Sequence, residues 1–267
     1  MELIDIGLNL TSERFRKDRD TVLQQAVDAG VRRMILTGTN VRESRRAHTL
    51  TQTHPGTLYS TAGVHPHVAK DVESDWLDAL RELHARPEVV AVGETGLDFN
   101  RDFSPRPVQE RVFEQQLELA CDSGLPVFIH QRDAHDRLHP ILRSVRDQLS
   151  DAVVHCFTDN RQALWDYLDL DLHIGITGWV CDKRRGRDLQ ALVPDIPADR
   201  LMVETDAPYL IPRDLDPKPE HNRNEPRFLP HIVRAIARLR GEEPEALAAS
   251  TTRNAERFFR LPAADSA

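Results

Sequence analysis

The sequence contains few cysteines and no long run of apolar residues. Its three cysteines, Cys121, Cys156 and Cys181, are odd in number and show no CxxC spacing, so neither a disulfide framework nor a thiolate zinc site is predicted. No stretch of about 18 apolar residues occurs, and the N-terminus lacks the basic and apolar segments of a secretory signal. We therefore expect a cytoplasmic protein without a membrane anchor.

The sequence also has no excess of positive charge and no segment with the composition of a linker. The formal net charge is −8, which argues against a surface that wraps duplex DNA but leaves room for a local basic site. No Gly/Ser-rich or low-complexity segment divides the chain, and 267 residues suffice to bury a large core. We expect one domain over residues 1–262 and a frayed tail over residues 263–267.

Short apolar runs recur along the chain and alternate with helical patterns. Such runs are typical of strands that are buried on both faces of a parallel sheet. Strands are expected at Leu3–Leu10, Arg33–Thr37, Leu58–Val64, Val89–Gly93, Pro126–His130, Ala152–Phe157, Leu172–Thr177 and Leu201–Asp206. Helices are expected at Thr21–Gly30, Val41–Thr53, Ser74–Ala85, Pro107–Ser123, Ala134–Leu149, Arg161–Leu168, Asp188–Leu192, Leu229–Arg240 and Pro244–Phe259.

This alternation predicts an α/β fold, specifically a (β/α)8 TIM barrel of the metal-dependent hydrolase type. A doubly wound open sheet is the alternative, but it would carry a glycine-rich phosphate loop after its first strand. The segment Gly7–Asn9 is not such a loop. In a barrel the functional residues gather at the carboxyl ends of the strands.

Polar side chains end six of the expected strands and should converge at one place. A cluster of buried acids and imidazoles is costly without a cation, so the cluster predicts a metal site. The ligand types fit zinc, manganese, iron or magnesium, and a metal-bound water indicates hydrolysis. Asp206 is the best candidate for a general base or further ligand, and Glu204 should lie one layer deeper on the same face. The six residues are Asn9, His65, Glu94, His130, His155 and Asp206.

Cations and aromatic residues follow several strand ends. An acidic protein that places them beside a metal site fits a polyanion with stackable bases, although each residue alone could equally be a solvated loop residue. His65 could add a phosphate contact. The loop residues are Arg101, Phe103, Arg132, Trp179, Lys183, Arg184, Arg185, Tyr209, Arg213, Lys218 and Arg223.

Seven segments closely resemble the TatD family of metal-dependent deoxyribonucleases: Asp5–Thr11, Ile35–Asn40, Gly63–His67, Gly93–Asp98, His155–Thr158, Gly175–Trp179 and Glu204–Tyr209. The resemblance implies a monomeric cytoplasmic barrel with magnesium-dependent 3′ to 5′ exonuclease activity on single-stranded DNA and RNA ends, acting in the repair of oxidative DNA damage. It implies no stable protein partner.

The same resemblance implies roles for individual residues. Glu94, His130 and His155 would be metal ligands, Asp206 a ligand or catalytic base, and His65 a substrate or catalytic contact. Asn9, Trp179, Lys183, Arg184, Arg185, Tyr209 and Arg213 are the further expected substrate contacts.

The chain departs from most of the family at the end of the first strand. A His-x-His pair is usual where this sequence has Gly7 and Asn9. Fewer and harder ligands favour weakly held Mg²⁺, with Mn²⁺ or Zn²⁺ as alternatives.

Two other functions stay open at this point. An amidohydrolase-type enzyme acting on a small ester or amide would share the barrel, but it commonly uses the His-x-His pair and a bridging modified lysine. A non-enzymatic interaction module in protein quality control would require the metal cluster to be vestigial.

Overall fold

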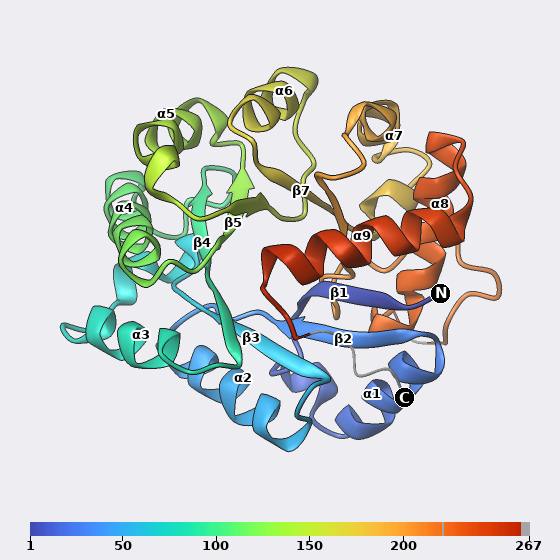
Figure 1. Cartoon of the computed structure of the whole chain (residues 1–267), viewed down its shortest axis with the longest axis horizontal. Coiled ribbons are helices and arrows are strands. Elements are labelled where there is room, and N and C mark those ends of the chain that lie inside the picture. The colour runs from blue at the N-terminus through green and yellow to red at the C-terminus, as the bar shows by residue number, and fades with distance from the viewer. Residues whose placement is uncertain (221, 263–267) are drawn as a thin grey trace.

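Eight parallel strands follow one another around the molecule, each paired with the next in chain order, in a computed structural model that describes residues 1–220 and 222–262 (Figure 1). This confirms the predicted (β/α)8 TIM barrel. The strands are β1 (Leu3–Leu8), β2 (Val31–Leu36), β3 (Leu58–Ala62), β4 (Val89–Asp98), β5 (Val127–Arg132), β6 (Ala152–Val154), β7 (His173–Ile176) and β8 (Leu201–Val203).

Helices cover the outside of the strands. They are α1 (Arg19–Asp28), α2 (Val41–Thr53), α3 (Trp76–His84), α4 (Arg106–Ser123), α5 (His135–Val145), α6 (Arg161–Asp169), α7 (Arg187–Leu192), α8 (Leu229–Arg240) and α9 (Pro244–Phe258). Short 3-10 helices include η2 (Pro66–Asp71) and η4 (Gly178–Cys181). Among the described residues, no helix combines the length and the hydrophobicity needed to cross a bilayer. The expected tail at 263–267 lies outside the described residues.

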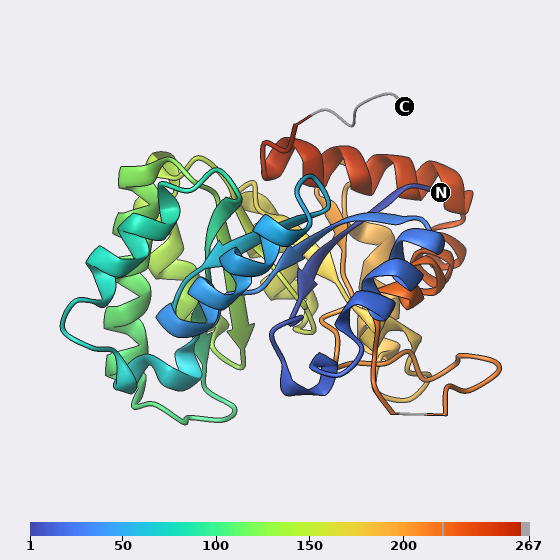
Figure 2. The ribbon, with the colours of Figure 1, turned by 90° about the horizontal axis from the view of Figure 1, so that it is seen from below.

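The final helix closes the amino end of the barrel. It packs against β1 and β8, and Figure 2 shows it lying across the end from which the strands start. Phe258 and Phe259 of α9 join a buried cluster with strand residues that include Ile4, Phe128 and Met202. The carboxyl ends of the strands therefore stay free for a site at the opposite end.

The sheet closes between β1 and the segment that follows β8. Leu8 and Ala207 form an isolated parallel bridge, and the N–H of Asn9 donates to the carbonyl of Ala207 at 2.8 Å. The N–H of Asp206 donates to the carbonyl of Gly7 at 2.9 Å. We call these contacts the seam. The pairing of β1 is irregular between Asp5 and Leu8, so strict two-residue alternation does not hold there.

Candidate active site

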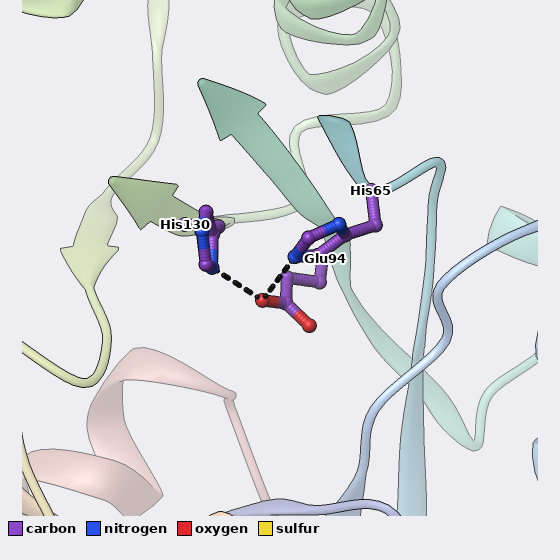
Figure 3. Close-up of side chains that lie close together, drawn as sticks. All are labelled: His65, Glu94 and His130. Carbon is purple, nitrogen blue, oxygen red and sulfur yellow. Dashed lines mark hydrogen bonds and ion pairs between the residues drawn. The ribbon is translucent and has the colours of Figure 1, made fainter. Parts of the chain in front are cut away.

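Glu94 lies at the centre of the strand ends, with one carboxylate oxygen facing three imidazoles. Its Oε1 is 3.0 Å from Nδ1 of His130, 2.8 Å from Nε2 of His155 and 3.3 Å from Nε2 of His65. Figure 3 shows His65 and His130 on either side of this oxygen. Ligand atoms of His65, Glu94 and His130 lie within 4.8 Å of one another. The structure thus brings together the cluster expected from the strand ends.

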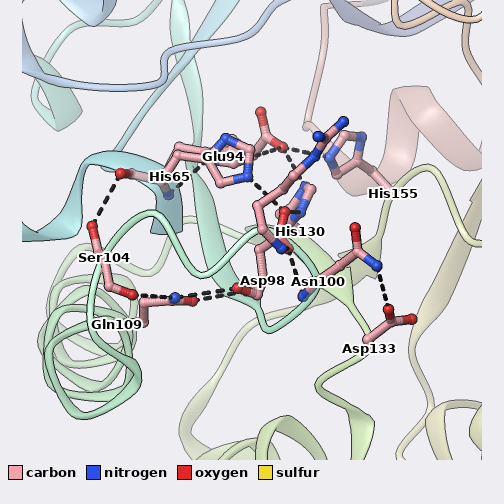
Figure 4. Close-up of polar contacts among 11 residues, drawn as sticks. His65, Glu94, Asp98, Asn100, Ser104, Gln109, His130, Asp133 and His155 are labelled. Carbon is pink, nitrogen blue, oxygen red and sulfur yellow. Dashed lines mark hydrogen bonds and ion pairs between the residues drawn. The ribbon is translucent and has the colours of Figure 1, made fainter.

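Asp98 belongs to the same cluster, although it was not among the expected site residues. Its Oδ2 is 2.6 Å from Nε2 of His67 and 3.3 Å from Nε2 of His130. Its Oδ1 accepts the backbone N–H groups of Asn100 and Arg101 at 3.0 and 2.8 Å (Figure 4). The missed signal was the even separation of Asp98 from Glu94, which places both on one face of a longer β4.

Helix α4 holds the backbone around Asp98 in place. Gln109 Oε1 accepts the N–H of Asp98 at 2.9 Å, and Gln109 Nε2 donates to the carbonyls of Asp98 and Ser104 at 3.2 and 2.8 Å. Ser104 donates to the carbonyl of His67 at 3.0 Å. Gln109 is 1% exposed. These buried amide contacts hold the carboxyl end of β4, and with it the second acid of the cluster, against α4.

Glu204 lies deeper inside the barrel, as expected. Its Oε2 is 3.2 Å from Nδ1 of His155, and its Oε1 accepts the N–H of Cys156. A Cβ added at Gly7 would approach Oε2 of Glu204 to 2.2 Å. Glycine at this position therefore leaves the space that the Glu204 carboxylate fills.

Asp206 reaches the site from the seam. Its Oδ1 accepts Nδ2–H of Asn9 at 2.9 Å, so two expected residues are joined directly. Asp206 has a left-handed backbone with φ of 54°. Asp5 holds the preceding residue, because its carboxylate accepts the N–H of Thr205 at 2.9 Å and the hydroxyl of Thr205 at 2.5 Å.

The carboxylate of Glu94 is ionised among its imidazoles. Burial disfavours the charge, but His65, His155 and His130 outweigh burial and hold the pKa of Glu94 well below its usual range. Burial also opposes protonation of His155, yet Glu204 and Glu94 raise its pKa well above the usual range. The pKa of His130 is raised because hydrogen bonds to Asp98 and Glu94 outweigh its burial.

Two other groups of the site have shifted pKa values, one lowered and one raised. Burial lowers the pKa of His65 to about 4, so this imidazole is neutral near pH 7. Burial, together with the charges of Glu94 and Glu204, raises the pKa of Asp206 to about 8 although His155 opposes the shift. A divalent cation beside Asp206 would favour its ionised form. The cluster therefore combines acids and imidazoles whose charges a metal ion would balance.

A cavity opens over these side chains. Its lining includes the site residues together with two exposed aromatics, Phe103 at 55% and Tyr209 at 53% exposure. Arg101 and Arg132 line the same cavity. The loop after β4 and the last residue of β5 thus supply cations at the mouth.

A neighbouring cavity shares Tyr209 and is lined by Trp179, Arg185, Arg213 and Arg14. The guanidinium of Arg185 lies 4.8 Å from the centre of the Trp179 ring, and its Nε donates to Asp182 at 3.0 Å. Four of the expected substrate contacts, Trp179, Arg185, Tyr209 and Arg213, therefore lie at the mouth.

Other basic loop residues lie elsewhere. Lys183 and Arg184 are exposed, and neither belongs to the described lining of these two cavities. Arg223 pairs with Asp18 at 2.6 Å and with Glu225 at 2.7 Å, and its guanidinium covers the ring of Phe15. Arg223 was named from the sequence as one of the loop cations, and the structure pairs its charge with these two carboxylates.

Comparisons with known proteins agree with this geometry. The 3'-5' ssDNA/RNA exonuclease TatD of Erwinia billingiae is 54% identical over 98% of this chain and 100% of its own length. The protein of the same name from Salmonella typhimurium is 52% identical over 97% of this chain and 99% of its own. A TatD homologue of Escherichia coli superposes with a TM-score of 0.88 at 28% identity, covering 97% of this chain and 98% of its own.

The family model described as TatD related DNase matches residues 4–260, a range that runs from β1 through α9. The matched range includes every residue of the Glu94 cluster and both sides of the seam. The resemblance seen in the strand-end segments thus extends over the whole barrel, and the chain belongs to the TatD-related DNase family of hydrolases.

Proposed function

We propose that this chain is a magnesium-dependent 3′ to 5′ exonuclease that removes nucleotides from the ends of single-stranded DNA and RNA. The observation that carries the proposal is the meeting of Glu94 with three imidazoles beneath a mouth of cations and exposed aromatics. The names of the bacterial relatives support the substrate and the direction. A monomeric state, a cytoplasmic location and a role in repairing oxidative DNA damage, all implied by the family, are part of this proposal.

Glu94, His130, His155 and Asp206 would hold the metal ion. Their donor set fits a divalent cation, since a carboxylate centred among imidazoles and a buried acid with raised pKa are balanced by positive charge. Magnesium keeps several waters and uses substrate phosphate oxygens, which suits a site with few protein ligands. When bound, such an ion polarises a phosphoryl oxygen and lowers the pKa of a water molecule.

Asp206 is suited to accept the proton of the attacking water. It lies at the edge of the cluster, where Asn9 fixes its carboxylate with one hydrogen bond and leaves other lone pairs free. A divalent cation at the site would lower the pKa of Asp206 and keep it ionised, which is the form that accepts a proton. Asn9 then acts as a positioning residue.

His65 is suited to hold the phosphate. Its Nδ1 accepts the N–H of His67 at 3.1 Å, so the single proton of the neutral ring lies on Nε2. This N–H points at Glu94 in the structure and can donate to a phosphate oxygen that enters between them.

The mouth favours unpaired nucleotides. Phe103 and Tyr209 offer exposed ring faces, and stacking on such rings requires bases that are not already stacked in a duplex. Arg101, Arg132 and Arg213 supply charge for the backbone. We expect single strands to be degraded in preference to duplex.

An end-labelled oligonucleotide assay tests the proposal. DNA and RNA single strands with a blocked 3′ or 5′ end are incubated with Mg²⁺ or with excess chelator. Shortening should need Mg²⁺ and a free 3′ end, and Glu94→Gln, His130→Ala and His155→Ala should abolish it while melting curves stay cooperative. Glu82→Gln, an exposed position of α3 that belongs to neither cavity lining, is the matched control for Glu94→Gln and should keep full activity. Activity in excess chelator, or in Glu94→Gln, contradicts the proposal.

The structure favours neither alternative function. Glu204 occupies the space that a side chain at position 7 would need, which argues against an amidohydrolase-type metal pair built from the first strand. The bridging lysine of such enzymes has no counterpart at Glu94. Membership of a nuclease family removes the non-enzymatic module.

A further inference from the structure

A second group of metal-ligating side chains lies outside the candidate active site. Cys181 at the end of η4, Asp214 in the loop after β8 and His231 in α8 place their ligand atoms within 4.8 Å of one another. Asp214 Oδ1 and His231 Nε2 are 2.7 Å apart. None of the three belongs to the described lining of the main cavity. The group is therefore separate from the cluster around Glu94.

The three side chains supply sulfur, nitrogen and oxygen to one point. Thiolate and imidazole together favour zinc over magnesium, which prefers an all-oxygen set. Three protein ligands leave the fourth position of a tetrahedral zinc ion to water. The side chains of His231 and Asp214 are 25% and 24% exposed, whereas Cys181 is buried. The group is thus open to solvent on one side and closed on the other.

The surroundings of Cys181 disfavour its thiolate unless a cation is present. Burial, together with the charge of Asp214 and a hydrogen bond to it, raises the pKa of the thiol, and Arg238 opposes the shift only in part. The thiol therefore keeps its proton beside the carboxylate when no ion is bound. A divalent cation reverses this balance, because a coordinating thiol is deprotonated.

We propose that Cys181, Asp214 and His231 bind one zinc ion, which fastens the loop after β8 to η4 and α8. The ligands come from these three segments, and α8 packs against η4. The loop already lies close to η4, since a Cβ added at Gly178 would meet the carbonyl oxygen of Leu210 at 2.4 Å.

The position of this zinc ion gives it a structural role at the mouth. Tyr209 lies in the loop after β8 and Trp179 lies in η4, and both line the second cavity. An ion that holds the loop against η4 therefore fixes the two aromatic rings relative to each other. The zinc supplies rigidity to the substrate side and takes no part in bond cleavage.

Cobalt substitution tests the proposal on the full chain. The protein is stripped with chelator and reloaded with Co²⁺, which shows a sulfur-to-metal charge-transfer band when a thiolate coordinates it. We expect this band in the unaltered chain, in Glu94→Gln and in Cys121→Ser, which removes a thiol from α4 as a matched control. Cys181→Ser should abolish the band. His231→Asn should weaken cobalt binding by at least about tenfold, the loss that follows when even an indirect partner of a metal ligand is removed.

Elemental analysis of the zinc-loaded chain completes the test. We expect Cys181→Ser to hold one zinc ion per chain fewer than the unaltered chain. If the unaltered chain lacks the cobalt band, or if Cys181→Ser keeps it, the proposal is overturned and the three side chains form only a hydrogen-bonded network.

A melting experiment decides the matter should Cys181→Ser fail to fold. Zinc should raise the melting temperature of Glu94→Gln but not that of Glu94→Gln with His231→Asn, because an ion that binds only the folded state stabilises it. Equal responses overturn the proposal. Neither measurement uses nuclease activity, so the zinc site and the proposed exonuclease function stand or fall separately.

Discussion

Gly7 and Glu204 show how one absent side chain shapes the site. The sequence revealed that Gly7 stands where a histidine is usual, but only the structure shows that Glu204 Oε2 would lie 2.2 Å from an added Cβ. The same carboxylate contacts Nδ1 of His155. Glycine at position 7 of β1 thus leaves room for the carboxylate that raises the pKa of His155, which follows β6. The pattern of a single strand could not predict this effect, because it depends on residues from three strands.

We predict that Gly7→Ala destabilises the fold by about 1–3 kcal/mol, the usual cost of overpacking a buried site. In the double variant, Gly7→Ala with Glu204→Ala, the clash is absent. Its destabilisation should therefore be smaller than the sum of the destabilisations of the two single variants, by about 1–3 kcal/mol. Urea unfolding of the two single variants and the double variant measures this coupling. Additive effects would show that the two positions do not compete for space.

Metal affinity should depend steeply on pH. His155 and His130 have raised pKa values, and burial raises the pKa of Asp206 to about 8, so all three tend to hold protons that a metal ion must displace. Affinity for Mg²⁺ should therefore rise with pH between about 6 and 8, by up to tenfold per pH unit for each proton released. Calorimetric titration at several pH values checks this, and a pH-independent Kd would contradict the assignment of these ligands.

Asp5 should make stability fall as pH rises. Burial raises its pKa from 3.8 to about 7, so between these values the folded chain keeps a proton that the unfolded chain releases. Asp5→Asn should therefore become more stable relative to the unaltered chain as the pH rises from 4 to 7. The quantity compared is the difference between their free energies of unfolding. The upper limit is about 4 kcal/mol, since each pKa unit is equivalent to about 1.4 kcal/mol. Denaturation at both pH values measures the difference, and a constant difference would disprove it.

At the scale of elements, the sequence predicted that the eight strands exist but not where each of them ends. All eight strands were expected, yet β4 extends to Asp98, because residues beyond Glu94 pair with β5 through partners such as Asp98 and Arg132. Conversely, β8 ends at Val203 because the backbone of Thr205 and Asp206 turns to bond with β1. Both changes depend on neighbouring strands, which local sequence does not describe. They also decide which carboxylates reach the site.

Two residues of the loop after β8 should separate the effect of stacking from that of charge. Tyr209→Ala should weaken binding of single-stranded DNA by about 1–3 kcal/mol with little change in salt dependence, because a ring face is lost. Arg213→Ala should instead flatten the salt slope by about 0.7, the contribution of one phosphate contact. Binding isotherms at several salt concentrations distinguish the two. A flattened slope in Tyr209→Ala would show that phosphate contacts are lost as well, and would contradict a role in stacking alone.

At the scale of the whole molecule, stability and chemistry lie at opposite ends of the barrel. Phe258 on α9 is buried against the strands at the amino end, whereas the site lies at the carboxyl ends. Phe258→Ala should lower the free energy of unfolding by about 3–5 kcal/mol. At a temperature where the variant is folded, kcat and KM should stay close to those of the unaltered chain. A large change in KM would show that the two ends are coupled.

The seam has a consequence for the protein while it is being made. Asn9 leaves the ribosome directly after β1, whereas Asp206 and Ala207, its partners across the seam, follow only after all eight strands have been synthesised. A nascent chain can pair its earlier strands, but it has neither Glu204 to contact His155 nor Asp206 to accept a proton. On the proposed mechanism, an enzyme that digests RNA ends therefore acquires its full site only after β8 has been synthesised, and copies that have not reached this point spare the messenger to which they are still attached.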